Sequence, residues 1–449
     1  MNRREFMTRS LMVGAGASLA RRGFASQSSP SASQPTSSDR IHVALIGSGA
    51  RGQELLQAAM QVPGVDIVSV CDAYTGRAER ARARTNGRAT IVNDYRQILD
   101  SKDIDAVIIA TPDHWHKSMA IDAVKGGKDV YIEKPLTYTV EDGQQIVDAV
   151  GRTKRILQVG SQGISSATVA KAREMIQAGR LGQITMIRAT YNRNTAEGAW
   201  IYPIPPDASE RTVNWEEFLG PAPKRPFSLE RFFRWRCYWD YSGGIATDLF
   251  VHLVTTIHHV MDARMPRNIM ASGELYRWKD TREVPDTVNA ILVYPEGFTV
   301  NLSSTFNNQT TSESGFEILG TEASIAFRGD TLNFAPEHAY DNNRWVVASW
   351  PEELERSYYA DPKVQARETP STWKPQMKEN REVWNEWGQE ATLIHMTRFF
   401  DAVRSRTPSA EDATVGHRAA AVAHLINRSI REKKPLEWDF QRETARRSG

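Results

Sequence analysis

Residues 41–52 read IHVALIGSGARG, a short apolar run that leads directly into glycines in the spacing G-x-G-x-x-G. A helix-like stretch follows, and then a second apolar run, VDIVSVCD at 65–72, which ends in Asp72. The glycine spacing alone is weak evidence. Its place between a strand and a helix, with an acidic residue about 20 positions further on, is typical of dinucleotide-binding folds. The pattern predicts a strand, a tight turn and a helix whose N-terminus binds a pyrophosphate.

Further strand-like and helix-like segments alternate downstream. The runs DAVIIATP (105–112), DVYIE (129–133) and ILQVGS (156–161) are separated by helix-like stretches at 114–125 and 140–152. This alternation is typical of a doubly wound parallel sheet. We therefore predict a Rossmann-type α/β domain over residues 41–162.

The carboxylate of Asp72 is expected at the end of the second strand. There it would accept hydrogen bonds from the ribose hydroxyl groups of the cofactor's adenosine half. The same negative charge would repel a 2′-phosphate. The sequence therefore favours NAD over NADP as the cofactor.

Lys134 stands between Glu133 and Pro135, directly after a strand-like run. Proline disfavours helical backbone in the residue before it, so Lys134 is expected to be extended at a strand end. The carboxyl ends of parallel strands share one edge of the sheet, where ligands bind. The alternative is a solvated surface lysine. The glycine loop at the same edge favours a lysine that faces the cofactor.

The glycine pattern, the segment ATPDHWH (110–116) and the triplet Glu133-Lys134-Pro135 resemble the Gfo/Idh/MocA oxidoreductases. The resemblance extends from residue 41 to the C-terminus. It implies that Lys134 lies beside the nicotinamide and orients or polarises the reacting alcohol, and that Glu133 helps to position it. The expected cofactor contacts are Gly47, Ser48, Gly49, Arg51, Gly52, Asp72, Thr111, Pro112, His116, Glu133, Lys134 and Gln162.

The second half of the chain is rich in strand-like runs. They lie at 184–193, 267–278, 287–297 and 298–308, with a further hairpin at 315–329. They predict an α+β substrate domain over 163–382, with an open, mostly antiparallel sheet that can hold a substrate against the nicotinamide. In the last segment, 383–449, amphipathic helices are expected at 384–406 and 414–434, packing back on the core.

The stretch SGGIATDLFVH (242–252) leads through a Gly-Gly turn into a predicted helix. Asp248 and His252 are four residues apart and share one helix face. In the resembled family, Gly-Gly followed by D-x-x-x-H supplies catalytic groups, which implies catalysis by this pair together with the lysine of the E-K-P triplet. Imidazole suits a general base. Thr255 and Thr256 stand where some family members carry an acid or a tyrosine, so the base stays open among the three residues.

Sugars bind to aromatic faces and to polar side chains that reach their hydroxyl groups. Tyr191, Arg193, Arg236 and Tyr238 flank the predicted catalytic elements and are the expected substrate contacts. The alternative for each of them is ordinary packing. No metal site is expected, because the His258-His259 pair is poorly spaced from His252 for ligands on one helix face.

The first 25 residues, MNRREFMTRSLMVGAGASLARRGFA, begin with basic residues and continue into a short apolar stretch. That stretch is about half as long as a membrane-spanning helix. We therefore expect a signal peptide, and Arg3-Arg4 is similar to the twin-arginine export signal of bacteria. The Ser/Pro-rich residues 26–40 are expected to form a disordered linker. This route would place the protein in the periplasm.

Composition narrows the class of partner. The formal net charge is only +2, and much of the positive charge comes from arginines in residues 1–25. The rest of the chain therefore favours neither nucleic acid nor an anionic membrane. The two cysteines are too few for a disulfide framework. A small carbohydrate is the expected partner, and a homo-oligomer is a further prediction.

Export limits the chemistry. Free NAD is scarce outside the cytoplasm, whereas the twin-arginine route carries folded proteins, so the cofactor is expected to be tightly bound. The sequence thus predicts an exported NAD-dependent oxidoreductase that acts on a sugar or polyol hydroxyl. One alternative is a glycoside hydrolase that uses NAD for transient oxidation and elimination. The other is a non-catalytic nucleotide-binding protein, which the lysine and the Asp/His pair disfavour.

Overall fold

The computed structural model describes residues 40–279, 282–309, 315–337, 343–368, 381–386, 388 and 390–447. The predicted signal peptide (1–25) and all but the last residue of the linker (26–40) lie outside these residues. Within the described part of the chain, no helix is long and apolar enough to cross a membrane.

The first sheet is parallel and has the strand order β3-β2-β1-β4-β5-β6. Its strands are β1 (Ile41–Ile46), β2 (Val65–Cys71), β3 (Thr90–Val92), β4 (Ala106–Ile109), β5 (Asp129–Ile132) and β6 (Leu157–Val159). The helices between them are α2 (Ala50–Ala59), α3 (Thr75–Arg84), α4 (Tyr95–Asp100), α5 (His116–Lys125) and α6 (Val140–Thr153), with a 3-10 turn η2 (Asp113–Trp115) before α5. The predicted doubly wound sheet is confirmed.

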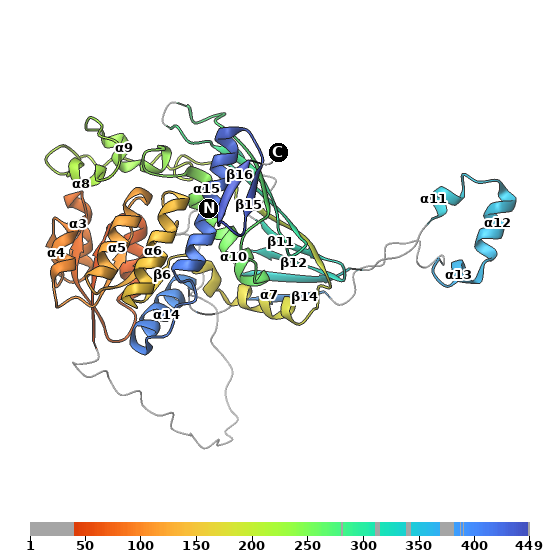
Figure 1. Cartoon of the computed structure of the whole chain (residues 1–449), viewed down its shortest axis with the longest axis horizontal. Helices are drawn as coiled ribbons and strands as arrows, with labels where there is room; N and C mark the ends of the chain where they lie inside the picture. The colour runs from red at the N-terminus through yellow and green to blue at the C-terminus, as the bar shows by residue number, and fades with distance from the viewer. Residues whose placement is uncertain are drawn as a thin grey trace, which may run out of the picture. The chain divides into compact units, whose positions relative to one another are not determined.

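Helices cover both faces of this sheet (Figure 1). Val43 and Leu45 of β1 pack in one apolar cluster with α2 and with helix α14 (Ala391–Ser405). Ala44 and Ile46 point the other way, into a cluster with α5 and α6. Because successive side chains of a strand alternate between faces, burial on both sides requires the nearly continuous apolar run seen at 41–46.

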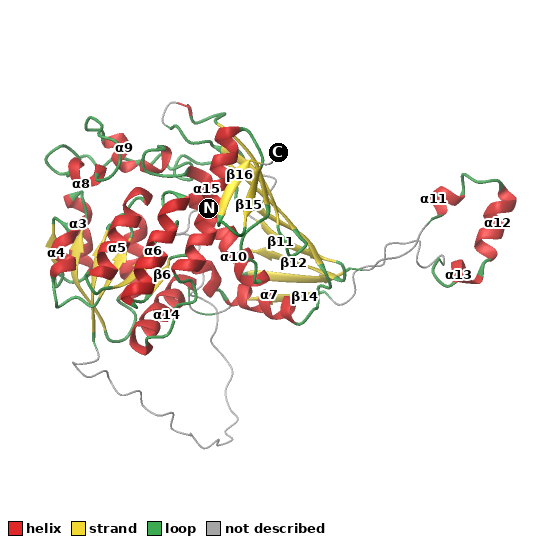
Figure 2. Ribbon diagram, viewed as in Figure 1, coloured by secondary structure: helices red, strands yellow, loops and turns green. Residues whose placement is uncertain are grey.

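The second sheet is mixed and mostly antiparallel, with the order β14-β13-β12-β11-β7-β10-β9-β8-β15-β16 (Figure 2). Among the described strands of this second sheet, only β7 and β10 pair in parallel. The strands are β7 (Ile184–Thr190), β8 (Asn268–Glu274), β9 (Thr287–Val293), β10 (Thr299–Thr305), β11 (Gly315–Gly320), β12 (Ala323–Arg328), β13 (Thr331–Pro336), β14 (Glu382–Asn385), β15 (Leu436–Asp439) and β16 (Thr444–Arg447). The prediction of an open, mostly antiparallel sheet is confirmed.

Helices cover one face of the second sheet and connect it to the first. They include η3 (Gln162–Ser165), α7 (Ala167–Gln177), α10 (Val251–Met261) and α15 (Ala413–Glu432). Helix α15 contacts both α6 and β8, so it bridges the two sheets. Short helices complete the chain: α8 (Trp215–Leu219), α9 (Leu229–Phe233), η4 (Trp235–Cys237), the π-turn η5 (Ala246–Phe250), α11 (Arg344–Val347), α12 (Glu352–Ala360) and α13 (Pro362–Gln365).

The last segment differs from the expectation of two helices alone. Residues 382–385 form strand β14, which pairs with β13, and the helix begins only at Ala391. The expected helix start at 384 is therefore wrong. Trp384 packs against the core of the second sheet, and this long-range contact outweighs the local helical pattern. After α15 the chain adds β15 and β16 to the same sheet.

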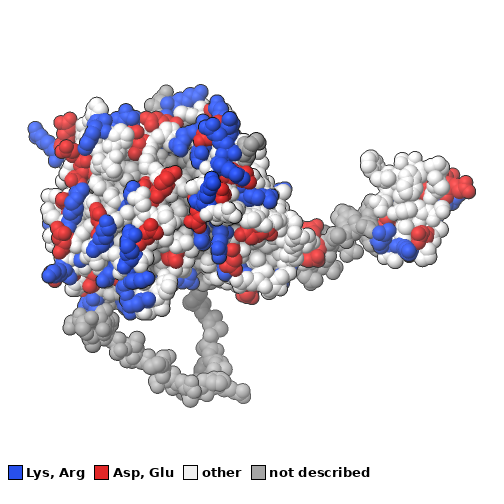
Figure 3. Space-filling model, in the orientation of Figure 1, with Lys and Arg blue, Asp and Glu red and all other residues white. Residues whose placement is uncertain are grey.

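Charged side chains of both signs are interspersed over the face shown in Figure 3. Lys and Arg number 56 against 54 Asp and Glu in the whole chain. This mixture lacks the broad basic stripe typical of nucleic-acid-binding proteins on that face.

Candidate active site

The glycine loop forms the tight turn that its sequence predicts. Gly47 has φ +90°, and a Cβ there would lie 2.6 Å from the backbone of Ala110. A Cβ on Gly52 would lie 2.0 Å from the carbonyl oxygen of Gly47. Gly49 differs, because a Cβ on it would meet only Arg77, at 3.9 Å. The first and third glycines thus allow close packing, and the second leaves open space above the N-terminus of α2.

Asp72 is fixed at the end of β2 by two backbone donors. Its carboxylate accepts hydrogen bonds from the N–H groups of Ser48 (2.7 Å) and Tyr74 (2.8 Å). Burial raises the pKa of Asp72, although Arg77 and these N–H groups act in the opposite direction. Ser48 therefore orients the carboxylate from within the glycine loop, and the remaining lone pairs of Asp72 can accept from ribose hydroxyl groups.

A cavity of about 680 Å³ lies above this edge of the first sheet. Residues of the second domain form its other wall. Of the predicted cofactor and substrate contacts, those that line it are Gly47, Gly49, Arg51, Asp72, Thr111, Pro112, Arg193 and Arg236. An open glycine cradle, a helix N-terminus and an oriented carboxylate fit the phosphates and ribose of NAD.

His116 does not line this cavity, contrary to the prediction that it contacts the cofactor. It is fully buried, and its ring nitrogens face the carbonyl oxygens of Pro135 (2.6 Å) and Thr111 (2.9 Å). The imidazole therefore holds the ends of β4 and β5 together, next to the cis Lys134-Pro135 peptide. Its effect on the site is to position the backbone at Lys134.

Tyr191 and Tyr238, predicted substrate contacts, do not line the cavity either. The ring of Tyr191 stacks against the guanidinium of Arg193, whose Cζ lies 5.1 Å from the ring centroid. Tyr238 is 8% exposed and is covered by Arg231 at 4.3 Å. Both aromatic rings pack within the second domain, which is the ordinary role considered for them.

Lys134 meets the predicted catalytic helix. Its ammonium group donates to the side-chain carboxylate of Asp248 and to the carbonyl oxygen of the same residue, each at 2.9 Å. Arg236 donates to that carboxylate at 3.0 Å. Burial alone would raise the pKa of Asp248, but Lys134 and Arg236 hold it well below its usual range. Asp248 is therefore an ionised acceptor that joins the two domains.

His252 lies one turn beyond Asp248, at the start of α10. Helix α10 follows directly on the π-turn η5 that carries Asp248, and both follow Gly244 at φ +62°. Burial, reinforced by the charge of Lys134, lowers the pKa of His252 to about 3. His252 is thus a neutral imidazole beside the Lys134–Asp248 pair, able to accept a proton but not holding one at neutral pH.

The structure adds Asp113, which the sequence analysis missed. It is 3% exposed, and its carboxylate accepts from the hydroxyl group of Thr247 at 3.4 Å. Burial raises the pKa of Asp113 to about 7, although Lys134 acts in the opposite direction. Its position in ATPDHWH, at the end of β4 and next to the lysine strand, was the signal that could have identified it.

Glu133 forms a buried ion pair beneath the site. It accepts from Nε of Arg51 at 2.7 Å, and its side chain is 7% exposed. Burial would raise the pKa of Glu133, but Arg51 and Lys134 hold it below its ordinary value. A Cβ on Gly160 would come within 2.9 Å of this carboxylate. Gln162 lies close by in sequence, and its buried side-chain oxygen has no hydrogen-bond partner among the described residues.

A second buried carboxyl group near this pair predicts an unusual pH dependence of stability. Glu411 is 0% exposed, and burial raises its pKa from 4.5 to about 8, against a hydrogen bond from Ser161. Between these values the folded chain keeps a proton that the unfolded chain releases, so stability falls by ~1.4 kcal/mol per pH unit. Glu411→Gln keeps the neutral form, so it should stabilise the protein at pH 8 and not at pH 4.5.

Urea unfolding at both pH values measures this difference. Glu352→Gln, at a glutamate whose side chain is 80% exposed, is the matched control and should show no such pH dependence. An equal effect of Glu411→Gln at both pH values would show that Glu411 is ionised in the folded protein.

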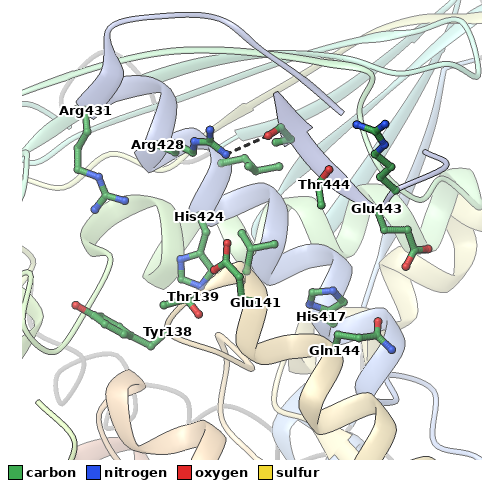
Figure 4. A pocket seen from close by; sticks show the side chains of 14 residues that line it. Tyr138, Thr139, Glu141, Gln144, His417, His424, Arg428, Arg431, Glu443 and Thr444 are labelled. Carbon is green, nitrogen blue, oxygen red and sulfur yellow. Dashed lines mark hydrogen bonds between the residues drawn. The ribbon is translucent and has the colours of Figure 1, made fainter. Parts of the chain in front are cut away.

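A separate cavity of about 550 Å³ lies between α6, α15 and β16 (Figure 4). His424, which lines this cavity, faces the carbonyl oxygen of Thr137 at 2.8 Å and is 9% exposed.

The ring of His258 contacts the Tyr294 hydroxyl group, at 3.0 Å. Among the described residues, no group of His, Cys, Asp or Glu has the arrangement of a metal site.

Comparisons with known proteins agree with this geometry. Residues 41–161 match the family described as "Oxidoreductase family, NAD-binding Rossmann fold", and residues 213–326 match "GFO/IDH/MocA C-terminal domain". Inositol 2-dehydrogenase of Salmonella typhimurium is 32% identical over 158 residues, covering 34% of this chain and 47% of that protein. The match thus covers about half the length of this relative.

Of two further relatives, the first matches a longer part of this chain and the second is named as a glycosidase. Levoglucosan dehydrogenase of Pseudarthrobacter phenanthrenivorans is 26% identical over 355 residues, covering 68% of this chain and 83% of that protein. Alpha-N-acetylgalactosaminidase of Shewanella oneidensis is 31% identical over 159 residues, 34% of this chain and 35% of that protein.

The fold is also shared with solved structures. A levoglucosan dehydrogenase in complex with NADH and levoglucosan superposes with a TM-score of 0.63 at 23% identity, covering 89% of this chain and 99% of that one. The two matching family domains together span more than half of the 449 residues, in the order that the fold requires. With its glycine cradle, E-K-P lysine and second-domain Asp/His pair, this chain belongs to the Gfo/Idh/MocA family of NAD-binding oxidoreductases.

Proposed function

We propose that this protein is an exported, NAD-dependent oxidoreductase that oxidises a hydroxyl group of a sugar or polyol and keeps its cofactor bound. The observation that carries the proposal is the ion pair between Lys134 and Asp248, at 2.9 Å, where the nucleotide-binding domain meets the second domain. Dehydrogenases of inositol and levoglucosan among the relatives support this substrate class. Arg3-Arg4 in the N-terminal sequence supports export.

Oxidation of an alcohol removes a hydride from carbon and a proton from oxygen. NAD, when bound, supplies the acceptor for the hydride. Lys134 donates to Asp248 through its ammonium group, and its remaining N–H can donate to the substrate oxygen. Asp248 fixes the direction of that donor. The neutral imidazole of His252 can then take the hydroxyl proton as the C–H bond breaks, since an oxygen that is becoming a carbonyl gives up its proton readily.

The segment 193–240, which we name the covering segment, supports retention of the cofactor. It crosses the cavity and is bonded to the nucleotide-binding domain just after Asp72, where Asn214 N–H donates to Ala73 (2.7 Å) and Thr75 N–H donates to Thr212 (3.0 Å). On the other side, the Trp115 indole donates to the carbonyl oxygen of Phe218 at 3.0 Å. These bonds hold the covering segment against the nucleotide-binding domain, which favours slow release of a bound dinucleotide.

The glycosidase alternative also has an observation in its favour, the match to alpha-N-acetylgalactosaminidase. That match covers only 35% of the relative. In that chemistry the same lysine and histidine would serve a transient oxidation that is later reversed. Release of an aryl leaving group from chromogenic glycosides, without net NADH formation, would distinguish it from the oxidoreductase.

The proposal predicts close to one NAD(H) per chain after purification without added nucleotide. The measurement is to desalt the exported protein, denature it and quantify the released dinucleotide by chromatography. Gly52→Ala, whose Cβ would clash with the carbonyl of Gly47 at 2.0 Å, is the control that should carry no nucleotide. Its circular dichroism spectrum checks that it folds. An empty wild-type protein would contradict the retained cofactor.

Catalysis is tested on the same preparation. Sugars and polyols are added singly, and reduction of the bound NAD is followed by absorbance in a single turnover. A sugar that produces NADH supports the oxidoreductase. Retained nucleotide that no sugar reduces, with no cleavage of chromogenic glycosides, would favour the non-catalytic nucleotide-binding alternative.

A further inference from the structure

On its second-domain side, the cavity is lined by two arginines, Arg193 and Arg236. Lys134 and Arg236 both bind the one carboxylate of Asp248, at 2.9 and 3.0 Å. His252 is neutral because its pKa is about 3. Asp113, the other buried acid beside Lys134, is only partly ionised at neutral pH because its pKa is about 7. The one carboxylate of Asp248 is therefore shared by two cations.

Arg193 adds a further cation to this end of the cavity. It follows strand β7, lines the cavity, and is close enough to Asp248 to help lower the pKa of that carboxyl. Its guanidinium is held by stacking on Tyr191, at 5.1 Å, and by donating one N–H to the carbonyl oxygen of Gly198 at 3.1 Å. The other N–H donors of the fork stay available.

Acidic groups near Arg193 do not neutralise it. Among the described residues, no carboxylate lies within ion-pair distance of Arg193. Glu54, Asp72, Glu197 and Glu217 also line the cavity, but none of them forms an ion pair with Arg193. The guanidinium of Arg193 is partly buried and is held in place by an aromatic ring and a backbone oxygen. It is therefore a preorganised hydrogen-bond donor for an anion.

The field of a partly buried guanidinium without a carboxylate partner attracts anions more strongly than it would in bulk water. Neutral sugars gain nothing from that field. The planar fork of Arg193 also matches the two oxygens of a carboxylate or phosphate.

We infer that the substrate is an anionic sugar, a sugar acid or sugar phosphate, whose charged group is bound by Arg193 while the hydroxyl group to be oxidised lies at Lys134 and His252. This inference rests on the proposed function and narrows its substrate class. It assigns Arg193 as a specificity-determining residue, separate from the three catalytic candidates.

Matched sugars that differ only at C6 test the inference on the NAD-loaded protein. The panel pairs glucose with glucuronate and glucose 6-phosphate, and galactose with galacturonate and galactose 6-phosphate. Binding is measured by calorimetry, and turnover by reduction of the bound NAD. Comparison of the sugar carboxylates with the sugar phosphates identifies which anionic group the site prefers. An anionic member is expected to exceed its neutral parent by at least about tenfold in kcat/KM, from a charge-assisted hydrogen bond.

Substitutions separate specificity from folding. Arg193→Gln should lower kcat/KM for the anionic sugar by about 10- to 100-fold, through KM, and change that of the neutral parent by less than about threefold. Arg193→Lys should recover part of the loss because it keeps the charge. Arg188→Gln, at an exposed arginine of the same strand β7, is the matched control and should behave as wild type.

The outcomes are distinct. Equal or better binding and oxidation of the neutral parents would overturn the inference and leave the proposed oxidoreductase intact. The same conclusion would follow if Arg193→Gln weakened neutral and anionic sugars equally, since that pattern marks a structural role. If no member of the panel bound to the loaded protein or reduced its NAD, both the inference and the proposed function would fail.

Discussion

Replacing Lys134 with alanine is expected to lower kcat for sugar oxidation by about 10³-fold while the amount of bound NAD stays unchanged. The ammonium group donates to the carboxylate and to the carbonyl oxygen of Asp248, each at 2.9 Å, and its remaining N–H can donate to the reacting oxygen. Alanine removes that donor and leaves Asp248 oriented by Arg236 alone. The NAD content is expected to persist because glycines of the loop and Asp72 line the cavity, whereas Lys134 is not among its lining residues.

Single-turnover reduction of bound NAD measures the chemical step directly, and released nucleotide is quantified on the same sample. Lys117→Ala is the control, since Lys117 pairs with Asp142 on the surface of α5 and its side chain is 38% exposed. A rate for Lys134→Ala within about tenfold of wild type, a barrier change of only ~1.4 kcal/mol, would show that Lys134 takes no part in the reaction.

The second large effect is expected at Arg51. Arg51→Met should destabilise the folded protein by about 3–5 kcal/mol, because it leaves the buried carboxylate of Glu133 without its ion-pair partner. Glu133 is 6% exposed, so water cannot replace the lost hydrogen bond at 2.7 Å. The loss should be largest near neutral pH, where Glu133 is ionised, and should diminish as the pH falls and Glu133 becomes protonated.

A double-mutant cycle tests the origin of that loss. Glu133→Gln combined with Arg51→Met removes both charges, so the double variant should be more stable than Arg51→Met alone. Urea unfolding of the nucleotide-free proteins gives the four free energies of unfolding without a contribution from cofactor binding. Strict additivity of the two substitutions would mean that Arg51 does not stabilise the fold through Glu133.

Local sequence was sufficient to predict much of the fold and part of the site. The glycine loop could be identified because steric limits apply within a few residues, as at Gly47 and Gly52, where any Cβ would meet backbone atoms. The edge position of Lys134 followed from the shared direction of parallel strands. Asp248 and Lys134 were named separately from a family resemblance, and the structure brings them to 2.9 Å.

Other features depend on contacts between residues far apart in the sequence. The pattern around 384 indicated a helix, but pairing with β13 makes it strand β14. His116 was expected to face the cofactor, but its two ring nitrogens face the carbonyl oxygens of Thr111 and Pro135. The end-of-strand position of Asp113 was visible in the sequence, but its contact with Thr247, 134 residues further along the chain, was not.

The sequence by itself determined a nucleotide-binding sheet, its cofactor loop and the lysine at its edge, because these follow from backbone sterics and strand direction over short stretches. Only the tertiary structure decided which charges meet across the domain boundary. The ionised state of Asp248 and the neutral state of His252 depend on burial and on partners from distant segments, and Arg193 has no carboxylate partner among the described residues. Electrostatic energy is set by distance and desolvation in three dimensions, and neither quantity is encoded in the spacing of residues along the chain.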